Sequence, residues 1–452
     1  MRLRKTITTI VATAILLAGW QLFAVIANQP ELIPSLPRLV RTLCEWLVSG
    51  SFYQSVGATI FRGVLGMSIS FVCAIGMAGL FARFEWVYEL FRPLLAIMRS
   101  IPVISFILLA LIFLNPESIP LMIAFLTMFP LLTENLTRGI LDLRPGLSIM
   151  ARQFHIRRSN VLFQIIYPQL KPFLYSGLAS ATGFGWRAII MGEVLSQCAF
   201  GIGSEMKRAQ NFISVPERLA WTIVAVFISF FFDKGISKGA DITPKISFAN
   251  EDQTIPAPTL SVLDTKDISY QYGIQHFSHS FQKGIIYGIN APSGKGKTTL
   301  LNLIGDILLP TEGEIHPTRH FGIATIFQQP QLLPHLTAEE NIILPLSSFL
   351  TEEKARRIAQ KHLQEMEMEP FGNRYPKELS YGQQQRIAIA RALAYPSPLL
   401  LMDEPFKGLD EALSHRIIER IREKQMKEER IILFTSHNPD EIRLLADEVI
   451  YL

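Results

Sequence analysis

The stretch INAPSGKGKTTLL, from Ile289 to Leu301, decides the fold of the C-terminal half of this 452-residue chain. An apolar strand pattern leads into it, and a helical pattern begins at Lys297. Backbone N–H groups at a helix start attract phosphate oxygens, a lysine reaches the outer phosphates, and a following hydroxyl can bind Mg²⁺. The stretch therefore predicts a phosphate-binding loop in an α/β domain, although Ala291 replaces the usual first glycine.

Every residue of this loop is a candidate for binding a nucleotide. Thr298 is also a candidate Mg²⁺ ligand, because its hydroxyl directly follows the lysine. The candidates are Ala291, Pro292, Ser293, Gly294, Lys295, Gly296, Lys297, Thr298 and Thr299.

Two acids end a second apolar strand pattern, PLLLMDEPFKGLD, which runs from Pro398 to Asp410. Asp403 is predicted to hold Mg²⁺, and Glu404 is predicted to polarise the water that attacks the γ-phosphate. The alternative is a strand followed by an acidic turn. Four apolar residues directly before Asp-Glu-Pro favour the catalytic interpretation.

The segment ELSYGQQQRIAIARAL resembles the signature of ABC ATPases, with Ser380, Gly382 and Gln383 retained and Tyr381 in place of a glycine. A serine hydroxyl at a helix N-terminus suits a γ-phosphate that another subunit presents. A plain amphipathic helix would not require Ser-x-Gly-Gln at its start. The resemblance covers residues 260–452, with its motifs in the family's order, and implies an ABC ATPase domain that binds ATP with Mg²⁺.

The same resemblance implies roles for five further residues. Gln328, in IATIFQQP, corresponds to the family's glutamine that contacts Mg²⁺ and water, and His437, in IILFTSHNPDE, to the histidine that faces the γ-phosphate. A lone histidine is more often structural, but its place one strand beyond the two acids favours the functional interpretation. Tyr272, in ISYQYG, is expected to stack on adenine, with Tyr270 as the alternative. Asp410 is the last candidate contact to the nucleotide.

The N-terminal half has a different composition. Residues 1–245 contain 22 lysines and arginines against 12 acids, whereas residues 246–452 contain 21 against 27. The whole chain is 49% hydrophobic with a mean hydropathy of +0.27, too apolar for an ordinary soluble enzyme. A basic, apolar half followed by an acidic, polar half predicts a membrane domain joined to a cytosolic one. A soluble enzyme with a phosphate-binding loop is thereby excluded.

About six apolar stretches have the length of a membrane span. They lie near residues 6–27, 56–82, 88–114, 118–138, 172–195 and 216–232. With the N-terminus inside, the inside segments carry 14 lysines and arginines and the outside segments carry 5, as the positive-inside rule requires. We therefore expect an uncleaved first helix, a helical transmembrane domain over residues 1–235, a linker over 236–259 and the α/β ATPase domain over 260–452.

The long inside segment, residues 143–172, is basic and amphipathic. A loop lying on anionic lipid headgroups is one interpretation. With LIPSLPRLV, TIFRGVLGMSIS and LLAIMRSIPVISF before it, however, the layout resembles permeases of type I ABC importers, most closely the nitrate, sulfonate, taurine and thiamine-precursor group. The resemblance implies a coupling helix near 144–160 that docks in a groove of the ATPase. The family's Glu-Ala-Ala falls on Ile149, Met150 and Ala151, and its following glycine falls on His155, so only Ala151 matches.

Four ionisable residues lie at or near membrane depth, where an unpaired charge is costly. They are Arg62, Arg99, Arg187 and Glu193. Arg62 and Arg99 could reach the membrane surface near helix ends, and Glu193 could pair with Arg187, line the solute pathway or lie at a subunit interface. Pro102 is expected to break a helix.

The three cysteines, Cys44, Cys73 and Cys198, have no metal-binding or redox spacing and are interpreted as packing residues.

Because one chain supplies one permease and one ATPase, the family resemblance implies a homodimer in which each ATP lies between one loop and the partner's signature. We expect an importer in a bacterial inner membrane, in contact with membrane lipid and supplied with a small solute by a periplasmic binding protein, with no nucleic-acid partner. A different class remains open, a non-transporting ABC complex that uses ATP for transmembrane signalling. The sequence does not distinguish a homodimer from a heterodimer or name the solute.

Overall fold

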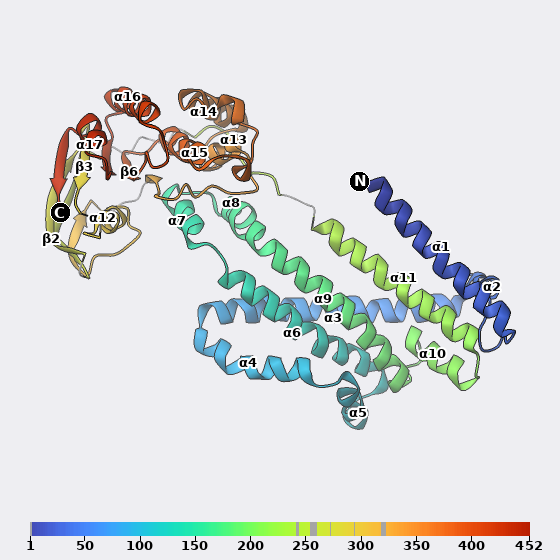
Figure 1. Cartoon of the computed structure of the whole chain (residues 1–452). Helices are drawn as coiled ribbons and strands as arrows, with labels where there is room; N and C mark the ends of the chain where they lie inside the picture. The colour runs from blue at the N-terminus through green and yellow to red at the C-terminus, as the bar shows by residue number, and fades with distance from the viewer. Residues whose placement is uncertain (1, 241–243, 254–259, 272, 293, 318–321) are drawn as a thin grey trace. The chain divides into compact units, whose positions relative to one another are not determined.

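The computed structural model describes residues 2–240, 244–253, 260–271, 273–292, 294–317 and 322–452. The chain forms two compact units (Figure 1). The membrane unit comprises residues 1–143 and 169–242, and the ATPase unit comprises residues 144–168 and 243–452. The segment 144–168, here called the coupling segment, therefore leaves one unit to fold as part of the other.

The membrane unit is built from helices. They are α1 (Arg2–Ala27), α2 (Leu36–Trp46), α3 (Gly50–Arg83), α4 (Glu85–Ser100), α5 (Val103–Phe113), η1 (Pro116–Ser118), α6 (Ile119–Leu141), α9 (Tyr167–Ser196), α10 (Ile202–Asn211) and α11 (Val215–Gly239).

Small residues allow α3 and α6 to pack closely in the membrane unit. Gly66, Ala74 and Ala78 are buried along one side of α3, and a Cβ atom added at Gly66 would lie 2.6 Å from the Cβ atom of Ala124 on α6. Short side chains let two helix backbones approach, which favours association inside a membrane. The α3–α6 pair is therefore the centre of this unit.

Three helices of the described chain have the length and apolarity of a membrane span, namely α3, α6 with η1, and α11. A fourth span is possible if α4 and α5 are counted together, but these two helices are bent by 95°. The bend lies at Ile101–Pro102, because Pro102 ends the helix as predicted. The expected span over 88–114 is therefore a bent pair of helices, broken at the predicted proline, and the prediction of about six spans is not reproduced. The described apolar part of α1 is Val11–Ala27, and α9 is long but less apolar.

Glu193 does not pair with Arg187. Its side chain is fully buried and lies 2.8 Å from Arg62, while Thr59 and the backbone N–H of Gly203 also donate to it. Arg62 also contacts Glu117, at 2.5 Å. A buried carboxylate with an ion pair and several donors is a structural group of the membrane unit, so the expectation that Glu193 lines the pathway is wrong.

Two sheets form the frame of the ATPase unit. An antiparallel sheet has the order β2-β1-β4, and a parallel sheet has the order β5-β6-β7-β3-β8. The strands are β1 (Val262–Tyr270), β2 (Ile274–Gln282), β3 (Ile286–Asn290), β4 (Glu312–His316), β5 (Ala324–Ile326), β6 (Leu399–Asp403), β7 (Ile431–Thr435) and β8 (Glu448–Tyr451). Strands β6 and β7 are buried throughout, as expected for the centre of a parallel sheet.

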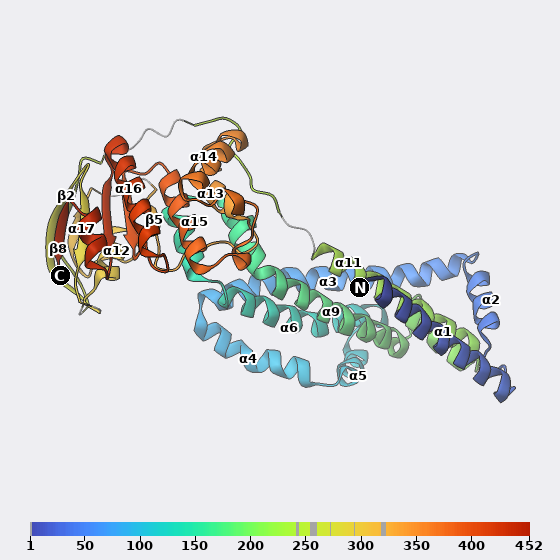
Figure 2. The same cartoon turned by 45° about the horizontal axis from the view of Figure 1, so that its top comes forward.

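Helices surround this frame (Figure 2). They are α7 (Pro145–Gln153), α8 (Arg158–Asn160), η2 (Val161–Ile166), α12 (Lys297–Ile304), α13 (Ala338–Leu346), α14 (Glu352–Glu365), η3 (Glu369–Phe371), η4 (Pro376–Glu378), α15 (Tyr381–Ala394), α16 (Glu411–Glu428) and α17 (Pro439–Leu445). The largest core cluster joins α7 and Phe154 of the coupling segment to β5, α13 and α15.

Residues 244–253 have no regular secondary structure but are attached to the ATPase unit. The backbone N–H of Ala249 donates to the carbonyl oxygen of Ser347, and that of Gln253 donates to Phe349. Ile246 and Phe248 pack against the core. Of the expected linker over 236–259, residues 236–239 therefore belong to α11, and residues 244–253 are held against the ATPase unit.

Candidate functional site

The phosphate-binding loop follows β3, which lies between β7 and β8 in the parallel sheet. Gly294 and Gly296 have positive φ angles of 83° and 88°, a backbone conformation that favours glycine. A Cβ atom at Gly296 would also lie 2.5 Å from the carbonyl oxygen of Gly273. The two glycines are thus required for the shape of the loop, and α12 begins directly after it.

One pocket brings most of the expected site together. It has a volume of about 310 Å³. Its lining comprises Gly273, Gly294, Gly296, Lys297, Thr298, Thr299, Gln328, Glu404 and His437. The residues come from five separate parts of the sequence, and only Gly273 had not been singled out.

Lys297 lies at the base of this pocket. Its Nζ atom donates to the carbonyl oxygen of Ala291 at 2.8 Å and lies 3.3 Å from Nδ1 of His437. Ala291 contributes a backbone carbonyl and its own side chain is buried. The replacement of the usual glycine is therefore compatible with the loop, because the contact to the lysine does not depend on the side chain at this position.

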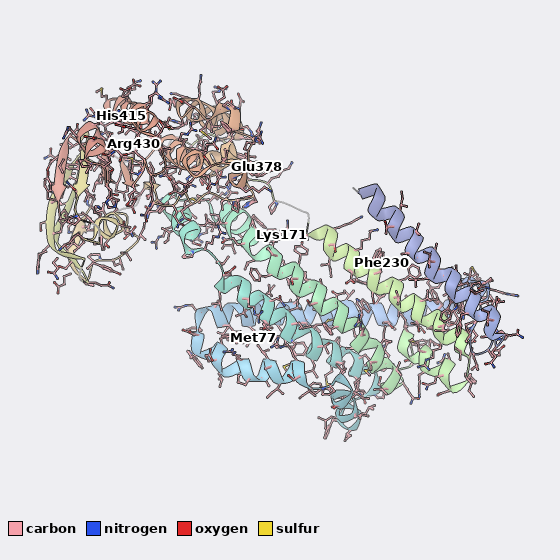
Figure 3. All side chains as sticks on the ribbon, in the orientation of Figure 1. Met77, Lys171, Phe230, Glu378, His415 and Arg430 are labelled. Carbon is pink, nitrogen blue, oxygen red and sulfur yellow. The ribbon has the colours of Figure 1, made fainter. Side chains whose placement is uncertain are left out.

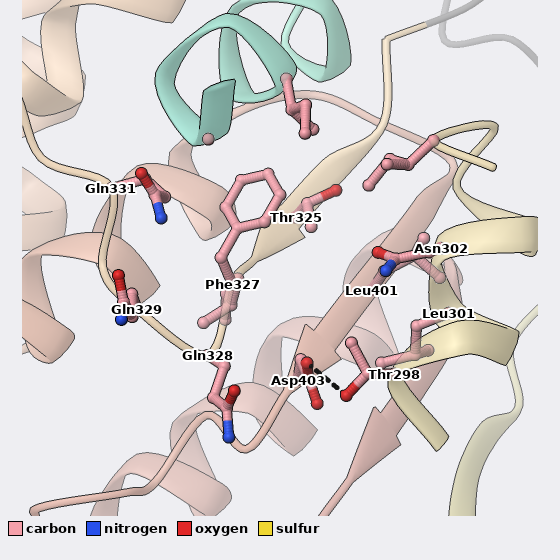
Figure 4. A pocket seen from close by; sticks show the side chains of 14 residues that line it. Thr298, Leu301, Asn302, Thr325, Phe327, Gln328, Gln329, Gln331, Leu401 and Asp403 are labelled. Atoms are coloured by element: carbon pink, nitrogen blue, oxygen red, sulfur yellow. Dashed lines mark hydrogen bonds between the residues drawn. The ribbon is translucent and has the colours of Figure 1, made fainter. Parts of the chain in front are cut away.

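Asp403 and Thr298 meet at the end of β6, as Figure 4 shows. The hydroxyl of Thr298 donates to one carboxylate oxygen of Asp403 at 2.9 Å, and the hydroxyl of Thr435 donates to the other at 2.8 Å. Burial raises the pKa of Asp403 even though both hydrogen bonds act in the opposite direction. The hydroxyl of Thr298 and the carboxylate of Asp403 thus lie together beside the pocket, as two oxygen groups that could bind a metal ion.

Glu404 occupies a strained backbone position next to Asp403, with φ of 49°. Its N–H donates to the hydroxyl of Thr435, and its carboxylate lies 2.8 Å from Nε2 of His437 and 3.4 Å from Lys407. Burial acts to raise the pKa of Glu404, but hydrogen bonding with Gln328 and the charges of Lys407 and His437 outweigh it and lower the pKa. The carboxylate is therefore ionised at neutral pH and faces the pocket.

Ser380 begins α15 as its N-cap. Its hydroxyl accepts from the N–H of Gln383 at 3.3 Å, while the side chain of Gln383 accepts from the N–H of Ser380 at 2.9 Å. This reciprocal capping explains why both residue types are needed at the helix start. Asp410 caps α16 in a similar way by accepting from Leu413.

Tyr381 connects the start of α15 with the loop after β5. Its hydroxyl donates to the carbonyl oxygen of Gln328 at 2.7 Å, and its ring lies against Gly408. Gly382 is needed here, because a Cβ atom on it would lie 2.6 Å from the carbonyl oxygen of Gly408. The tyrosine that replaces the family's glycine therefore forms a specific contact.

Several predicted nucleotide-binding residues do not line the pocket as the structure describes it. They are Ala291, Pro292, Lys295, Ser380, Tyr381, Gly382, Gln383 and Asp410. Tyr272 and Ser293 lie outside the described residues. Thr435 and Lys407 contact the two acids but were missed, because neither position belongs to a recognisable motif.

The coupling segment ends α7 with a left-handed turn. His155 has φ of 45°, its N–H donates to the carbonyl oxygen of Arg152, and the N–H of Ile156 donates to Ala151. These two hydrogen bonds are those of a Schellman motif, in which glycine is favoured at the left-handed position. The family's glycine is therefore replaced by His155 without a change of backbone shape.

Side chains of the coupling segment are built into the ATPase unit. Phe154 is fully buried, with its ring edge-on to Tyr395 at 5.2 Å and beneath the guanidinium of Arg391 at 5.4 Å. Gln153 donates to the carbonyl oxygen of Gly305 at 2.6 Å and accepts from Thr325 at 3.2 Å. These contacts join the segment to α12, β5 and α15.

Arg391 is a buried arginine that the sequence did not single out. It donates to the carbonyl oxygens of Gln331 and Pro330, both at 2.8 Å. Burial lowers the pKa of Arg391 to about 9, so it remains charged at neutral pH. It holds the loop after β5 against α15, and its guanidinium lies over the ring of Phe154.

A second pocket of about 270 Å³ extends from the coupling segment to the two oxygen ligands (Figure 4). Ile149 of the coupling segment lines it together with Phe327, Gln328, Thr298 and Asp403. Ile149 stands where the family has glutamate. An apolar side chain suits this position, because most of the surface that lines the pocket is apolar.

Two family profiles match separate parts of the chain. The family described as "ABC transporter" matches residues 274–407, and the family described as "Binding-protein-dependent transport system inner membrane component" matches residues 70–233. The two matches fall on the ATPase unit and mainly on the membrane unit, respectively.

Curated relatives match the ATPase part. An uncharacterized ABC transporter ATP-binding protein of Methanocaldococcus jannaschii is 34% identical over 201 residues, which is 40% of this chain and 85% of the relative. The Fe(3+) ions import ATP-binding protein of Rhizobium etli is 35% identical, over 40% of this chain and 54% of the relative. The glucose import ATP-binding protein of Saccharolobus solfataricus is 35% identical, over 38% of this chain and 52% of the relative. The chain thus spans about half the length of these two import proteins.

Among solved structures, an ATP-binding cassette in a dimeric post-hydrolysis state bound to ADP and Pi is 32% identical to this chain. The match covers 42% of this chain and 94% of that structure, with a TM-score of 0.40.

Proposed function

Because the chain belongs to the ABC transporter family, with a permease domain and an ATPase domain in one polypeptide, we propose that it imports a small solute through the ATP-driven movement of a homodimer. The protein is a membrane protein with a cytoplasmic ATPase domain that couples ATP hydrolysis to transport. The domain boundaries proposed from the sequence are 1–235 for the permease and 260–452 for the ATPase, with 236–259 as a linker.

The single observation that carries the ATPase assignment is the pocket that joins the loop after β3 with Gln328, Glu404 and His437. Lys297 is the proposed ligand of the β- and γ-phosphates, and its Nζ atom lies at the base of the pocket. Glu404 is the proposed base that polarises the attacking water, and Nε2 of His437 lies 2.8 Å from its carboxylate. Gln328 is the proposed residue that positions this water.

The residues present suit Mg²⁺ bound together with a nucleotide. Thr298 and Asp403 provide a hydroxyl and a carboxylate 2.9 Å apart, and Gln328 lines the same pocket. Mg²⁺ in phosphoryl-transfer sites prefers one or two protein oxygens together with phosphates and water. When bound, the ion would neutralise charge on the phosphates. Consistent with this, the described residues contain no cluster of three or more acidic, histidine or cysteine side chains that could form a complete metal site.

A second copy is proposed to complete the nucleotide site. Ser380, Gly382 and Gln383 lie at the exposed start of α15 and, among the residues described, do not line the pocket of their own chain. The resemblance of this segment to the ABC signature implies that it contacts ATP bound to the partner. With one cassette per chain, a twofold homodimer supplies both components.

The coupling segment is the proposed route by which closure of the dimer reaches the permease. Its α7 and Phe154 are packed into the core of the ATPase unit, whereas the chain on both sides belongs to the membrane unit. A rigid element that is covalently part of one unit and packed in the other transmits displacement without needing a particular charged contact.

We propose a bacterial inner membrane as the location and a periplasmic solute-binding protein as the partner that delivers the solute. Support comes from the match to binding-protein-dependent permeases over residues 70–233. The permease motifs resemble the nitrate, sulfonate and thiamine-precursor group, which suggests a solute of that kind.

The ATPase assignment is tested by two substitutions in one loop. Lys297→Met removes the ammonium at the base of the pocket, and Lys295→Met removes a charge that does not line it. In full-length protein in liposomes, we expect Lys297→Met to weaken ATP binding at least about tenfold, since a charge-assisted contact to phosphate is lost. Lys295→Met should bind ATP as the unmodified chain does. Equal ATP affinity in both variants would contradict the assignment.

A further inference from the structure

A groove in the membrane unit runs along α9, α10 and α11. Its volume is about 630 Å³, within the range of sites for small organic ligands. Arg187, Lys207 and Arg218 contribute positive charge, and Asp233 contributes the one carboxylate of the lining. Met191 and Phe230 are among the apolar side chains that form most of the rest (Figure 3 labels Phe230 on α11).

The charge of Arg187 indicates which kind of ligand this groove accepts. Arg62, the other arginine near Glu193, is neutralised by Glu193 and Glu117. The guanidinium of Arg187, by contrast, is exposed and forms no hydrogen bond or ion pair with any described residue. An unpaired charge in a membrane span is costly unless it faces water or meets a charged ligand.

The depth of Arg187 distinguishes a solute from a lipid headgroup. It lies nine residues before Ser196, the end of α9, which corresponds to about 14 Å along the helix. The hydrocarbon core of a bilayer is about 30 Å thick, so with Ser196 at its outer edge the backbone of Arg187 lies near the middle of the core, beyond the headgroup layer. Lys207 and Arg218 lie at the outer end of the groove, and Asp233 lies near the inner end of α11.

The two long helices of the groove also differ from each other. α9 is 30 residues long but is not among the described helices that are apolar enough for a lipid-exposed span. α11 is apolar, but only 17% of its span is buried inside the unit, compared with 28% for α3 and 50% for α6 with η1. The face between them is thus open within one chain, and Arg187 is the charged group that α9 contributes to its otherwise apolar side.

We propose that this groove is the solute pathway and that it accepts a small organic anion with an apolar body, such as a sulfonate or carboxylate, rather than a neutral or cationic heterocycle. The inference rests on the proposed import function and names the class of its solute. Lys207 and Arg218 attract the anion at the outer end, Arg187 binds it at mid-depth, and the methionine and phenylalanine side chains contact its apolar part.

The proposal is tested with charged thiol reagents, which need no knowledge of the natural solute. The exposed cysteines are first removed by Cys44→Ser and Cys73→Ser, while Cys198 is buried and can stay. Thr222→Cys then places a thiol in the groove, and Phe227→Cys places one on α11 outside it. The full-length protein in phosphatidylcholine vesicles is treated with sulfonatoethyl methanethiosulfonate or with its trimethylammonium counterpart. Each rate is divided by that reagent's rate with free mercaptoethanol.

In the Thr222→Cys protein we expect the anionic reagent to react about tenfold faster than the cationic one, because focused positive charge concentrates anions. Adding Arg187→Gln should reduce this ratio severalfold, and Arg187→Lys should largely restore it. Arg208→Gln is the matched control, since Arg208 is an exposed arginine on α10 that pairs with Glu205 outside the groove. The thiol introduced by Phe227→Cys should react slowly with both reagents.

Three results would overturn the proposal. The first is a ratio of anionic to cationic rates near one with Arg187 present, and the second is a ratio that Arg187→Gln does not change. The third is labelling that is blocked when phosphatidylglycerol is added to the vesicles, which would identify a lipid site. ATP hydrolysis is measured on the same vesicles. If the protein hydrolyses ATP but the groove fails these tests, the anion pathway is contradicted and the proposed function stands. If the groove labels as expected but the protein does not hydrolyse ATP, the proposed function is contradicted instead.

Discussion

The nucleotide pocket and the coupling segment both depart from the family pattern, but in different ways. The pocket keeps each reactive side chain, and the departures at Ala291 and Tyr381 lie beside it, where a backbone carbonyl contacts Lys297 and a tyrosine hydroxyl donates to Gln328. The coupling segment keeps only Ala151 of the family's Glu-Ala-Ala residues and lacks its glycine, yet it has a left-handed turn at His155 and buried apolar positions.

The comparison shows two kinds of constraint. Chemistry at the γ-phosphate needs particular charged groups within about 3 Å of the reacting atoms, so identity is retained there. Docking needs apolar volume and a helix that ends at the right place, which several sequences can supply. The altered coupling segment is therefore no reason to prefer a signalling complex over a transporter.

The largest expected effect is at Glu404. Glu404→Gln keeps the volume of the side chain but removes the carboxylate that polarises water, so the rate of ATP hydrolysis should fall by at least about a hundredfold. ATP binding should remain, because the phosphate contacts of the loop are intact. The measurement is phosphate release by full-length protein in liposomes, with Glu353→Gln on the exposed face of α14 as the control. Full hydrolysis by Glu404→Gln would exclude this residue as the base.

Removing the ring of Phe154 tests whether buried apolar volume anchors the coupling segment. Phe154→Ala should destabilise the ATPase unit by about 3–5 kcal/mol, because a fully buried aromatic ring is lost beneath Arg391 and beside Tyr395. The thermal unfolding midpoint of the detergent-solubilised chain measures this. Phe163→Ala, at a half-exposed position of the same segment, should cost much less. Equal losses would mean that Phe154 does not anchor the segment.

His155 tests whether the segment depends on backbone conformation. His155→Gly should leave stability unchanged or raise it slightly, since glycine adopts the left-handed region without strain but loses more entropy on folding. His155→Val should destabilise by about 1–3 kcal/mol, because a β-branched residue is strained at φ of 45°. We expect the unfolding midpoint to be highest or unchanged with glycine, intermediate with histidine and lowest with valine. A valine variant as stable as the parent would contradict this.

The smallest effect is expected at Tyr381. Tyr381→Phe keeps the ring against Gly408 and removes the hydrogen bond to the carbonyl oxygen of Gln328. A single hydrogen bond contributes about 0.5–1.5 kcal/mol, so the ATPase rate should change by less than about tenfold. A loss as large as that of Glu404→Gln would place Tyr381 in the reaction itself and would weaken the distinction between the two regions.

Much of the nucleotide site could be predicted because its elements are local. A loop between a strand and a helix, two acids at a strand end and a histidine after the next strand are each recognisable within a few residues. Parallel strands then bring these segments to one edge of the sheet. The roles of Thr435 and Arg391 could not be predicted, because each depends on partners more than thirty residues away in the sequence.

The membrane unit was less predictable for a physical reason. Hydropathy measures transfer into lipid, so it detects α3, α6 and α11 but not which helices face protein, water or a partner. The sequence also left the partner of Glu193 open, since Arg187 and Arg62 are equally reasonable partners by sequence. Only the packing of α3 against α9 and α10 decides that Glu193 is buried with Arg62 while Arg187 remains unpaired.

The sequence by itself determined that an ATP-driven machine is joined to a helical membrane domain, because local motifs and composition are sufficient for both. Tertiary structure alone decided where the coupling segment belongs. Its α7 and Phe154 fold with the ATPase unit although they lie between helices of the membrane unit, because the apolar surface they bury is supplied by β5, α13 and α15, more than 150 residues further along the chain.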